Sequence, residues 1–427
     1  METEPVQLDG RTLEGGGQLL RLSLSLASLL RVPIELSHIR GRRGPKTNVG
    51  KVGGMKPAHL AGAQWLAKAT AACTDGMEIG STKLLFRPPC TESSALNHEI
   101  GVWKDIFEQG KVARQETCIS MSTPGSIALI LQTILPHLLF GMPSSMPLRV
   151  NIEGGTNVSK SPSIDYVVHV LLPLLHEKLQ IQEVGVRVHA RGWSAGRSSV
   201  GYVSFDITPV AAGPIPAFQI SRRTTVTRID VILLASGNDN RLAIQNEVIA
   251  RLQTLLPGVT VDYAKEEDSG DVKRAYLMLI AETDSRQRLS SDGLYEAKSI
   301  RGRGKRKGEV SIDLLDRLRE FVSRVIDGLQ AELAHGGGVD QFMQDQIVVF
   351  QTLARGCAKV DTGSIQPTLH TLTARWVASK LLNVHFDDHG HCEGIGFRKA
   401  YPDEIEADGQ KNRTLQDLAR LDLHDNI

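Results

Sequence analysis

Residues 14–30 read EGGGQLLRLSLSLASLL, in which three consecutive glycines run directly into an amphipathic helical pattern. Glycine loses more backbone freedom on folding than other residues, so a triplet at the start of a helix indicates that another group approaches the main chain closely. The first turn of a helix presents unpaired N–H groups and a partial positive charge, which favour an anion. Arg21 could add a full charge. The alternative is a tight strand-to-helix turn that binds no ligand.

The pattern of a small or polar loop, a mostly apolar helix and a short strand occurs three times. The first helix is followed by the strand signal VPIELSHI (32–39). The second copy pairs a helix at 122–140 with a strand at 146–155, and the third pairs 367–382 with 383–388. Helices and strands that alternate in this way favour sheets covered by helices. The predicted fold class is therefore α/β or α+β, built from related units.

The composition of the chain changes near Val210, where the Pro/Gly-rich stretch AAGPIPAF (211–218) predicts a hinge. The segment that follows has strand, helix and strand signals of its own. We expect a small domain at 211–307, inserted into a large domain of residues 1–210 and 308–390. Residues 391–427 are expected to form an irregular tail.

Composition excludes some classes of protein. The 427 residues carry 49 Lys plus Arg against 48 Asp plus Glu, so no overall field draws the chain to nucleic acid or membrane, and a polyanionic ligand needs a local basic patch. Five cysteines without a CxxC pair argue against a disulfide framework and a structural zinc site. The acidic start has no apolar signal core, and the most apolar stretch (125–142) contains Gln132 and Pro136. We expect a soluble protein of the nucleus or cytoplasm, with no membrane association.

His370 lies in PTLHTLTARW (367–376), at or near the start of the third helix. A helix N-terminus disfavours the imidazolium ion, so a histidine there tends to stay neutral and nucleophilic. The same N–H groups could hold a phosphate that the ring attacks. The alternative is a histidine that only caps or packs.

Three further side chains are candidates for binding a nucleotide or a metal. Asp345, followed by Gln346, is expected to start an apolar helix, where its carboxylate either caps the helix or orients a ribose or a metal ion. Gln132 lies in the apolar second helix, where its amide needs a partner from the protein or from a ligand. Glu14 could help to hold a divalent cation bound to phosphates.

Two segments are locally basic. Arg40, Arg42, Arg43 and Lys46 form a dense loop after a strand, and guanidinium groups match phosphate oxygens well, although a solvated loop is the alternative. The run RGRGKRK at 301–307 either contacts RNA weakly, serves as a nuclear address or is merely exposed.

The histidines near the C-terminus suggest a metal site only superficially. His389, His391 and Cys392 have a spacing that fits no closed tetrahedral set, so no zinc site is expected there.

Taken together, these segments resemble the RNA 3′-terminal phosphate cyclase family, in its eukaryotic-type, catalytic branch. The matching segments follow one order over residues 5–387: LDGRTLEGGGQLLR, IRGRR, PAHLAGAQWLA, GSIALILQT, IEGGTNVSKSP, VDQFMQDQ and LHTLTA. The resemblance implies a large domain of three repeated βαβαββ units, akin to the C-terminal domain of bacterial translation initiation factor three, with a small α/β domain inserted before the third unit.

The resemblance also implies an activity. Such enzymes use ATP and a divalent metal, Mg or Mn, to convert an RNA 3′-terminal phosphate into a 2′,3′-cyclic phosphate. A histidine becomes covalently adenylated, AMP passes to the RNA 3′-phosphate, and the terminal 2′-hydroxyl closes the ring. A phosphate monoester is a poor electrophile until it carries a good leaving group, and covalent catalysis divides one hard step into easier ones.

The family's functional residues match particular positions in this chain. The nucleophile matches His370 and the metal-associated carboxylate matches Glu14. The family's nucleotide contacts match Gln132, Pro162, Phe342, Asp345 and Gln346. Its contacts to phosphate or to the RNA end match Arg21, Arg40, Arg43 and His59.

The sequence departs from the family pattern at one of these positions and at the residue that precedes another. Phe342 stands where a tyrosine is common, which keeps a ring for stacking on adenine but loses a hydroxyl. Ala58 replaces a glutamine that usually precedes His59. The main alternative function is a non-catalytic relative in ribosomal RNA processing, but such relatives lack the glycine-rich segment and the histidine. An enolpyruvyl transferase, which has a similar repeated unit, would leave His370 without a role.

Overall fold

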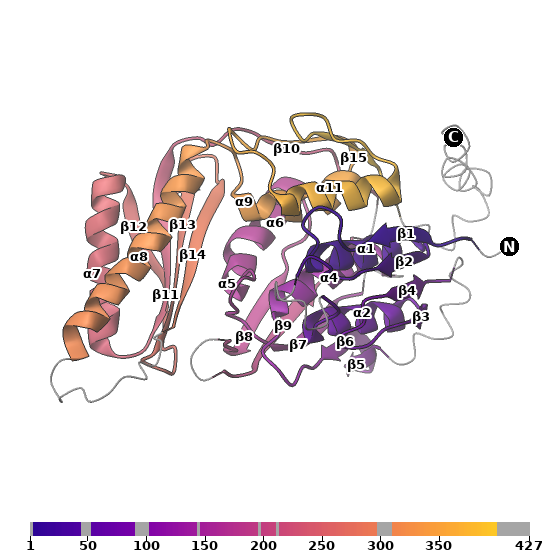
Figure 1. The fold of residues 1–427 in the computed structure, drawn as a ribbon, viewed down its shortest axis with the longest axis horizontal. Coiled ribbons are helices and arrows are strands. Elements are labelled where there is room, and N and C mark those ends of the chain that lie inside the picture. Colours follow the sequence, from indigo (N-terminus) through magenta and orange to yellow (C-terminus); the bar gives the residue numbers. More distant parts are fainter. Residues whose placement is uncertain are drawn as a thin grey trace.

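The structure is a computed structural model that describes residues 3–43, 53–89, 102–142, 146–194, 198–210, 213–296 and 310–398. These residues form a mixed α/β fold with four sheets (Figure 1). The basic run at 301–307 and Lys46 lie outside the described residues.

The N-terminal sheet has the order β1-β2-β4-β3, with β1 and β2 parallel and β4 antiparallel to both of its neighbours. Two helices connect its strands. The elements are β1 (Val6–Asp9), α1 (Gly17–Leu30), β2 (Ile34–Ser37), α2 (Pro57–Ala69), β3 (Cys73–Asp75) and β4 (Leu84–Arg87).

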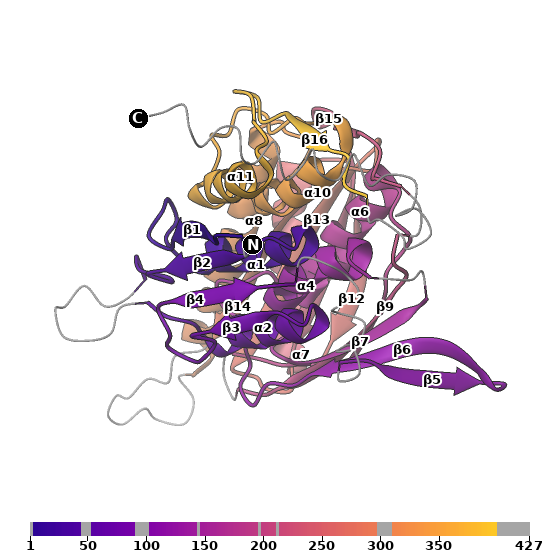
Figure 2. The same ribbon diagram turned by 90° about the vertical axis from the view of Figure 1, so that its right-hand side faces the viewer.

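The second sheet repeats this order in β6-β7-β9-β8 and adds β5 at its edge, in a hairpin that projects from the molecule (Figure 2). Strand β7 alternates buried and half-buried residues along its whole length, because one face of the sheet packs on the core. The elements are β5 (Lys104–Glu108), β6 (Lys111–Ile119), α4 (Ile127–Phe140), β7 (Leu148–Gly154), α5 (Ile164–Tyr166), the π-helix η2 (Val167–Leu171), α6 (Leu172–Leu179), β8 (Gly185–Ala190) and β9 (Gly201–Ile207).

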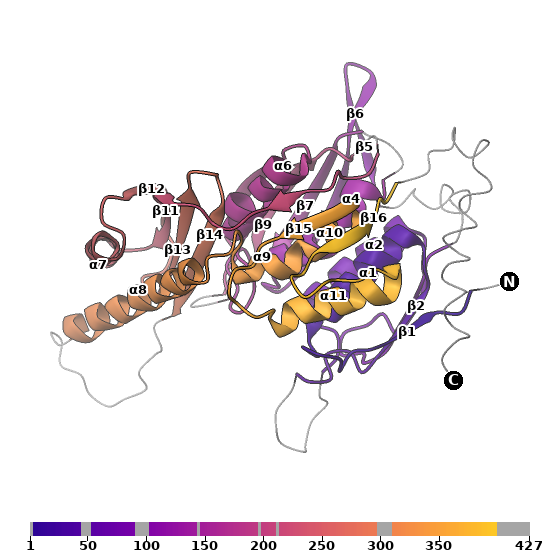
Figure 3. The same ribbon diagram turned by 90° about the horizontal axis from the view of Figure 1, so that it is seen from above.

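The third sheet has the order β10-β15-β16, in which β10 and β15 are parallel and β16 is antiparallel. Helices α1, α2, α4 and α11 pack against one another between the three sheets and share one core, and α4 is buried almost all round (Figure 3). The elements are β10 (Gln219–Ile220), α9 (Gln341–Gln346), α10 (Val348–Leu353), β15 (Arg355–Val360), α11 (Leu369–Leu382) and β16 (Cys392–Ile395).

The segment between β10 and α9 forms its own sheet, β12-β11-β13-β14, with α7 and α8 packed on one face (Figure 1). Successive residues of β11 alternate between two cores: Ile229 and Val231 face α7 and α8, whereas Ile232 faces the core of the large domain. The elements are β11 (Val226–Ala235), α7 (Asn238–Leu255), β12 (Thr260–Glu267), β13 (Arg274–Thr283), β14 (Arg288–Glu296) and α8 (Val310–Ala334).

The structure corrects the predicted limits of the insertion. The pairing of β10 with β15 places residues 219–220 in the third sheet, although the small domain was predicted to begin at residue 211. At its other end the insertion extends beyond residue 307, because α8 contributes Phe321 and Leu329 to the core of the inserted sheet. An amphipathic helix packs on whichever apolar surface lies nearest in the folded protein. The sequence of the helix does not reveal which surface that is.

Two predictions about the C-terminal part were also wrong in detail. Residues 383–388 do not form a strand; Phe386 makes one isolated bridge to Cys392. The strand that follows α11 is β16, which pairs with β15, so residues 392–395 are not part of an irregular tail. Residues 399–427 lie outside the described residues. Within the described ranges, no helix combines the length and apolarity that crossing a membrane requires.

Candidate active site

The glycine triplet begins α1 at Gly17, with Gly15 in the left-handed region at φ +61°. A Cβ atom on Gly16 would overlap the carboxylate of Glu14, and one on Gly17 would overlap Nε2 of His59 and lie 3.0 Å from Nη1 of Arg21. The side chain of Arg42 lies equally close to Gly15, so the close approach predicted for this backbone is made by four side chains of the protein itself. The glycines allow a carboxylate, an imidazole and a guanidinium to gather at the start of one helix.

Glu14 is the carboxylate of this group, and its side chain is buried. Its Oε2 accepts a hydrogen bond from the backbone N–H of Gly16 (2.6 Å), and its Oε1 pairs with the guanidinium of Arg43. The backbone N–H of Glu14 donates to Oγ1 of Thr373 (3.1 Å), which lies on α11. The glycine loop is thus bonded to the helix that carries His370.

His370 is the second residue of α11, as predicted, and Thr368 caps this helix by accepting from the N–H of Thr371 (3.1 Å). About half of the imidazole surface is exposed, and its Nε2 lies 4.0 Å from Oε1 of Glu14. Partial burial, with the charges of Arg21 and Arg43, lowers the pKa of His370. The ring is therefore neutral near pH 7 and accessible, as a nucleophile must be.

Gln18 connects His370 to Asp345. Nδ1 of His370 bonds to Oε1 of Gln18, and Nε2 of Gln18 donates to Oδ2 of Asp345. An ionised carboxylate only accepts hydrogen bonds, so the amide nitrogen of Gln18 must face Asp345 and the amide oxygen must face the imidazole. Nδ1 then carries the proton, and the lone pair of the neutral ring is on Nε2, the nitrogen nearer Glu14.

One of the two sequence-based alternatives was that Asp345 caps a helix. The structure shows that it does not. Asp340 is the N-cap of α9 and accepts from the N–H of Met343 (2.9 Å), so Asp345 lies near the end of that helix. Burial raises the pKa of Asp345 to about 7, although Gln18 and Arg21 oppose the shift. Gln18 thus links it to His370.

Arg21, on α1, donates from Nε to Oε1 of Gln132 (3.0 Å) on α4, which supplies the partner that this buried-helix amide was expected to need. Burial and the charge of Arg40 lower the pKa of Arg21 to about 10, against the opposing effects of Asp345 and Glu14. Among the described residues, no carboxylate forms an ion pair with Arg21. A buried guanidinium without a bonded anion, close to a second cation, is suited to bind phosphate.

Arg40 and Arg43 complete the basic group. Arg40 is half-buried, has a left-handed backbone (φ +55°) and donates from Nη1 to the carbonyl oxygen of Gly54 (3.0 Å). Burial and the charge of Arg43 lower its pKa. The cations repel one another in the absence of an anion, so a bound polyphosphate would relieve this repulsion.

His59, the third residue of α2, is buried, and its Nδ1 accepts from the backbone N–H of Lys56 (3.2 Å). Burial, reinforced by Arg21 and Arg40, lowers its pKa to about 3. The ring is therefore neutral, with its proton on Nε2 beside Gly17. It can donate a hydrogen bond to an anion at the start of α1.

The remaining candidates are Phe342 and Gln346 on α9, and Pro162. Phe342 is 46% exposed, and its ring meets that of Tyr166 edge-on at 6.3 Å. Nε2 of Gln346 donates to the carbonyl oxygen of Phe342 (3.1 Å). Pro162 is half-buried in the loop before α5, and in the described part of the chain no hydrogen bond or ion pair joins it to His370.

Gln18 is the site residue that the sequence analysis missed. It lies in the quoted glycine segment, three residues before Arg21, and so on the same face of α1. A buried amide on the face that carries the candidate arginine was a signal available in the sequence.

The donor atoms at the site determine whether it can hold a metal ion. In the described ranges no group of three or more His, Cys, Asp or Glu side chains could hold a metal ion alone. Mg²⁺ bound with a nucleotide commonly uses only one or two carboxylates beside substrate phosphates, and Glu14 supplies one. The carboxylate of Glu14 is an oxygen ligand that fits such a cation. To bind it, Glu14 would have to give up its ion pair with Arg43, and the guanidinium of Arg43 would then bind phosphate.

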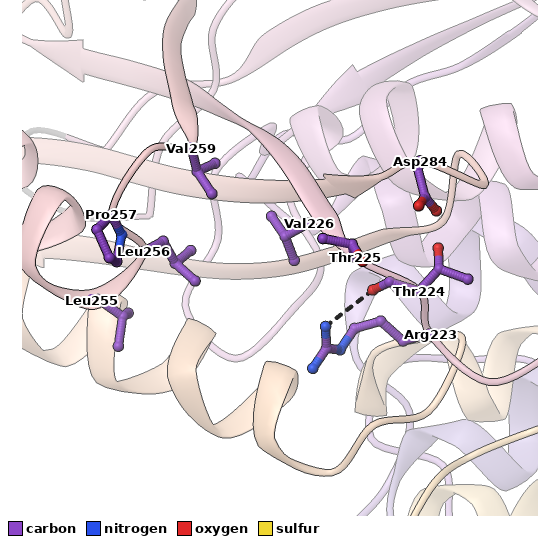
Figure 4. A pocket seen from close by; sticks show the side chains of 9 residues that line it. All are labelled: Arg223, Thr224, Thr225, Val226, Leu255, Leu256, Pro257, Val259 and Asp284. Atoms are coloured by element: carbon purple, nitrogen blue, oxygen red, sulfur yellow. Dashed lines mark hydrogen bonds between the residues drawn. The ribbon is translucent and has the colours of Figure 1, made fainter.

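A separate cavity of about 770 Å³ opens on the inserted sheet (Figure 4). In it, Nη1 of Arg223 donates to the carbonyl oxygen of Thr224 (3.1 Å). None of the candidate site residues lines this cavity, which is formed by Arg223, Thr224, Thr225, Val226, Leu255, Leu256, Pro257, Val259 and Asp284.

A neutral helix-terminal histidine, a buried carboxylate and three arginines define a class: an α/β protein whose site is built for phosphate chemistry. The sequence profile of RNA 3′-terminal phosphate cyclase matches residues 12–387, and the chain belongs to this family. The match does not separate the branches of the family, so the eukaryotic-type, catalytic branch stays a prediction.

Individual relatives agree with this assignment. The RNA 3′-terminal phosphate cyclase of Desulfurococcus amylolyticus is 28% identical over 86% of this chain and 90% of its own length. That of Sulfurisphaera tokodaii is 29% identical over 90% and 96% respectively. That of Pyrobaculum aerophilum is 28% identical over 92% and 99%.

Proposed function

We propose that this protein uses ATP to convert an RNA 3′-terminal phosphate into a 2′,3′-cyclic phosphate, with His370 as the nucleophile. The observation that carries the proposal is the orientation of the His370 ring: Gln18 occupies Nδ1, and Nε2 is left with its lone pair beside Glu14. The family and the names of the relatives support the overall reaction, and the histidine-AMP intermediate is our inference from this geometry.

In the first step, Nε2 of His370 attacks the α-phosphorus of ATP. A P–N bond forms, the bond between the α-phosphorus and its bridging oxygen to the β-phosphorus breaks, and pyrophosphate leaves. Arg21, Arg40 and Arg43 would hold the departing phosphates. The Nδ1 proton stays on the ring, where Gln18 accepts it in a hydrogen bond and so favours the positive charge that develops on the imidazole.

Two further transfers complete the reaction. An oxygen of the RNA 3′-phosphate attacks the phosphorus of the histidine-AMP, which restores neutral His370. The terminal 2′-hydroxyl then attacks the 3′-phosphorus, loses its proton and expels AMP. His59 would donate from Nε2 to a phosphate oxygen at the start of α1, and Phe342 would stack on adenine beside Pro162.

A divalent cation, Mg or Mn, held by Glu14 and phosphate oxygens would neutralise charge on the polyphosphate. Gln132 keeps Arg21 in place, and Asp345 keeps Gln18 in place, so both would act on ATP through a neighbour. Gln346, whose side chain bonds to the backbone of Phe342, would contact the nucleotide near its adenine ring. We also propose that the protein acts on RNA in the nucleus or the cytoplasm.

The test is conversion of a radiolabelled RNA that ends in a 3′-phosphate. With ATP and Mg²⁺, the terminal phosphate should become resistant to phosphatase, and RNA with a 3′-hydroxyl should not react. The His370→Ala variant should bind the RNA but leave its end sensitive to phosphatase. If wild-type protein binds the RNA and never changes its end, the non-catalytic alternative in ribosomal RNA processing is favoured.

A further inference from the structure

Helix α5 has three residues, and it lies between the inserted sheet and the helices of the large domain (Figure 1). We call Ser163, Asp165 and Tyr166 the α5 junction; each is buried, and each bonds to a different part of the chain. The π-helix η2 follows at Val167, and π-helical turns are frequent at functional sites.

Tyr166 connects the junction to α9. Its hydroxyl donates to Oδ1 of Asp340 (2.8 Å), the N-cap of α9, and Asp340 is fully buried. Oδ2 of Asp340 accepts from the N–H (3.1 Å) and the hydroxyl (2.9 Å) of Ser290 on β14. One carboxylate therefore joins α5, α9 and the inserted sheet, and removing the Tyr166 hydroxyl would leave Oδ1 of Asp340 with only the N–H of Met343.

The ring of Tyr166 contacts Phe342 directly. The two rings meet edge-on with centroids 6.3 Å apart and planes at 80°. Tyr166 is 3% exposed, whereas Phe342 is 46% exposed. The same tyrosine thus fixes the start of α9 by its hydroxyl and one edge of the Phe342 ring by its own ring.

Ser163 and Asp165 connect the junction to the inserted sheet. The hydroxyl of Tyr276, on β13, donates to Asp292 (2.8 Å) and accepts from Ser163 (2.6 Å), the residue after Pro162. Asp165 receives two hydrogen bonds from Arg191 (2.7 and 2.9 Å), whose Nε donates to Glu267 on β12 (2.8 Å).

We propose that the inserted domain is part of the ATP site: through the α5 junction it positions Phe342 and Pro162, the two residues proposed above to contact adenine. Tyr166 and Tyr276 are then positioning residues for adenine, and they touch neither the phosphates nor His370. This inference rests on the proposed function for the identity of the nucleotide.

The test compares Tyr166→Phe with wild type by the rate of self-adenylation against ATP concentration. Loss of one hydroxyl should raise KM for ATP by about fivefold to tenfold and leave kcat within about twofold. Inhibition by adenosine should weaken by the same factor, while inhibition by inorganic tripolyphosphate stays unchanged. Tyr263→Phe, on β12, is the matched control: its hydroxyl donates to the carbonyl oxygen of Gln245 on α7, away from the α5 junction, and the variant should behave as wild type.

A second variant and a double mutant complete the design. Tyr276→Phe should show the same pattern, and it decides the question if Tyr166→Phe does not fold. In a Phe342→Leu background, Tyr166→Phe should have no further effect on KM. Equal weakening of adenosine and tripolyphosphate, or a wild-type ATP dependence in both tyrosine variants, would overturn the inference.

Failure of the proposed function has a different signature. Wild-type protein that takes up no AMP would refute histidine adenylation alone. The roles of Tyr166 and Tyr276 in positioning the adenine contacts would then be tested by equilibrium binding of adenosine, because this measurement needs no chemical step. Adenosine binding should again weaken in both variants.

Discussion

In the proposed mechanism, the reactivity of His370 depends on a neighbour that carries no charge. Gln18 cannot change protonation, so its amide transmits the polarity of Asp345 to the imidazole and fixes which nitrogen carries the lone pair. The sequence predicted the histidine from its position at a helix start, but the two residues are 352 positions apart in the chain. No local pattern in the sequence relates them.

The Gln18→Met variant keeps the length of the side chain and removes the amide. Because the imidazole then has no partner that selects its tautomer, we expect the rate of self-adenylation to fall by at least about tenfold. The measurement is the initial rate of label uptake from ATP labelled at the α-phosphate. Gln7→Met, on the exposed face of β1, is the control. A wild-type rate in Gln18→Met would show that Gln18 does not set the tautomer of His370.

Asp345 should make adenylation dependent on pH. Its pKa, raised by burial to about 7, means that acid converts the carboxylate into a hydrogen-bond donor, after which Gln18 can turn and the proton can move to Nε2. We expect the wild-type rate to fall as pH decreases through about 7. Gln18, Arg21 and Asp340 are the polar groups that affect this carboxyl, and they are unchanged in the test.

The matched variant is Asp345→Asn, whose amide can donate at every pH. Its rate should be low and nearly constant between about pH 6 and pH 8. A variant profile that still falls with the wild-type midpoint would assign the pH dependence to another group.

At the scale of elements, the start of α1 is built around missing side chains. The sequence predicted that something approaches the glycine triplet, and the approaching groups are the side chains of Glu14, Arg21, Arg42 and His59. Periodicity predicted α1, α4 and α11 because their apolar faces are long. It could not predict β10, which has two residues and exists only because β15 pairs with it.

Gly16→Ala tests the role of the triplet. The added methyl group would overlap the Glu14 carboxylate, so the side chain must leave its place beside His370. We expect adenylation to fall by about tenfold or more, with a change in thermal stability no larger than a few degrees. Gly213→Ala, where a Cβ would meet open space although φ is positive, is the control for a glycine substitution by itself. Full activity in Gly16→Ala would show that Glu14 is dispensable.

At the scale of the whole molecule, the two cores could be predicted only in outline. Composition indicated a hinge near residue 211, but the strand that follows it belongs to the large domain, and α8 belongs to the inserted core. Such limits depend on which surface a segment covers in three dimensions. The contacts of the α5 junction, made across more than a hundred residues of sequence, depend on the same information.

His59 should affect the stability of the whole chain. Its pKa in the folded state is lowered from 6.5 to about 3, chiefly by burial, so the folded state binds fewer protons than the unfolded state in that interval. The stability from this group is complete above pH 6.5 and is lost as pH falls toward 3, by at most about 1.4 kcal/mol per pH unit.

Urea unfolding at a series of pH values measures this effect. In His59→Asn the free energy of unfolding should decrease less steeply below pH 6.5 than in wild type, because no imidazole remains to be protonated. The exposed His385→Asn variant should follow the wild type. Equal slopes in His59→Asn and wild type would contradict the burial of a neutral imidazole at the site.

The central claim is that His370 accepts AMP from ATP, and the most direct test is to find that bond. After incubation with ATP and Mg²⁺, digestion at neutral pH and mass spectrometry should find one adenylyl group on the tryptic peptide of residues 360–375, in which His370 is the only histidine. The adduct should be stable to alkali, labile to acid and absent from His370→Ala. An adenylyl group on any other peptide, or one that persists in His370→Ala, would contradict the account.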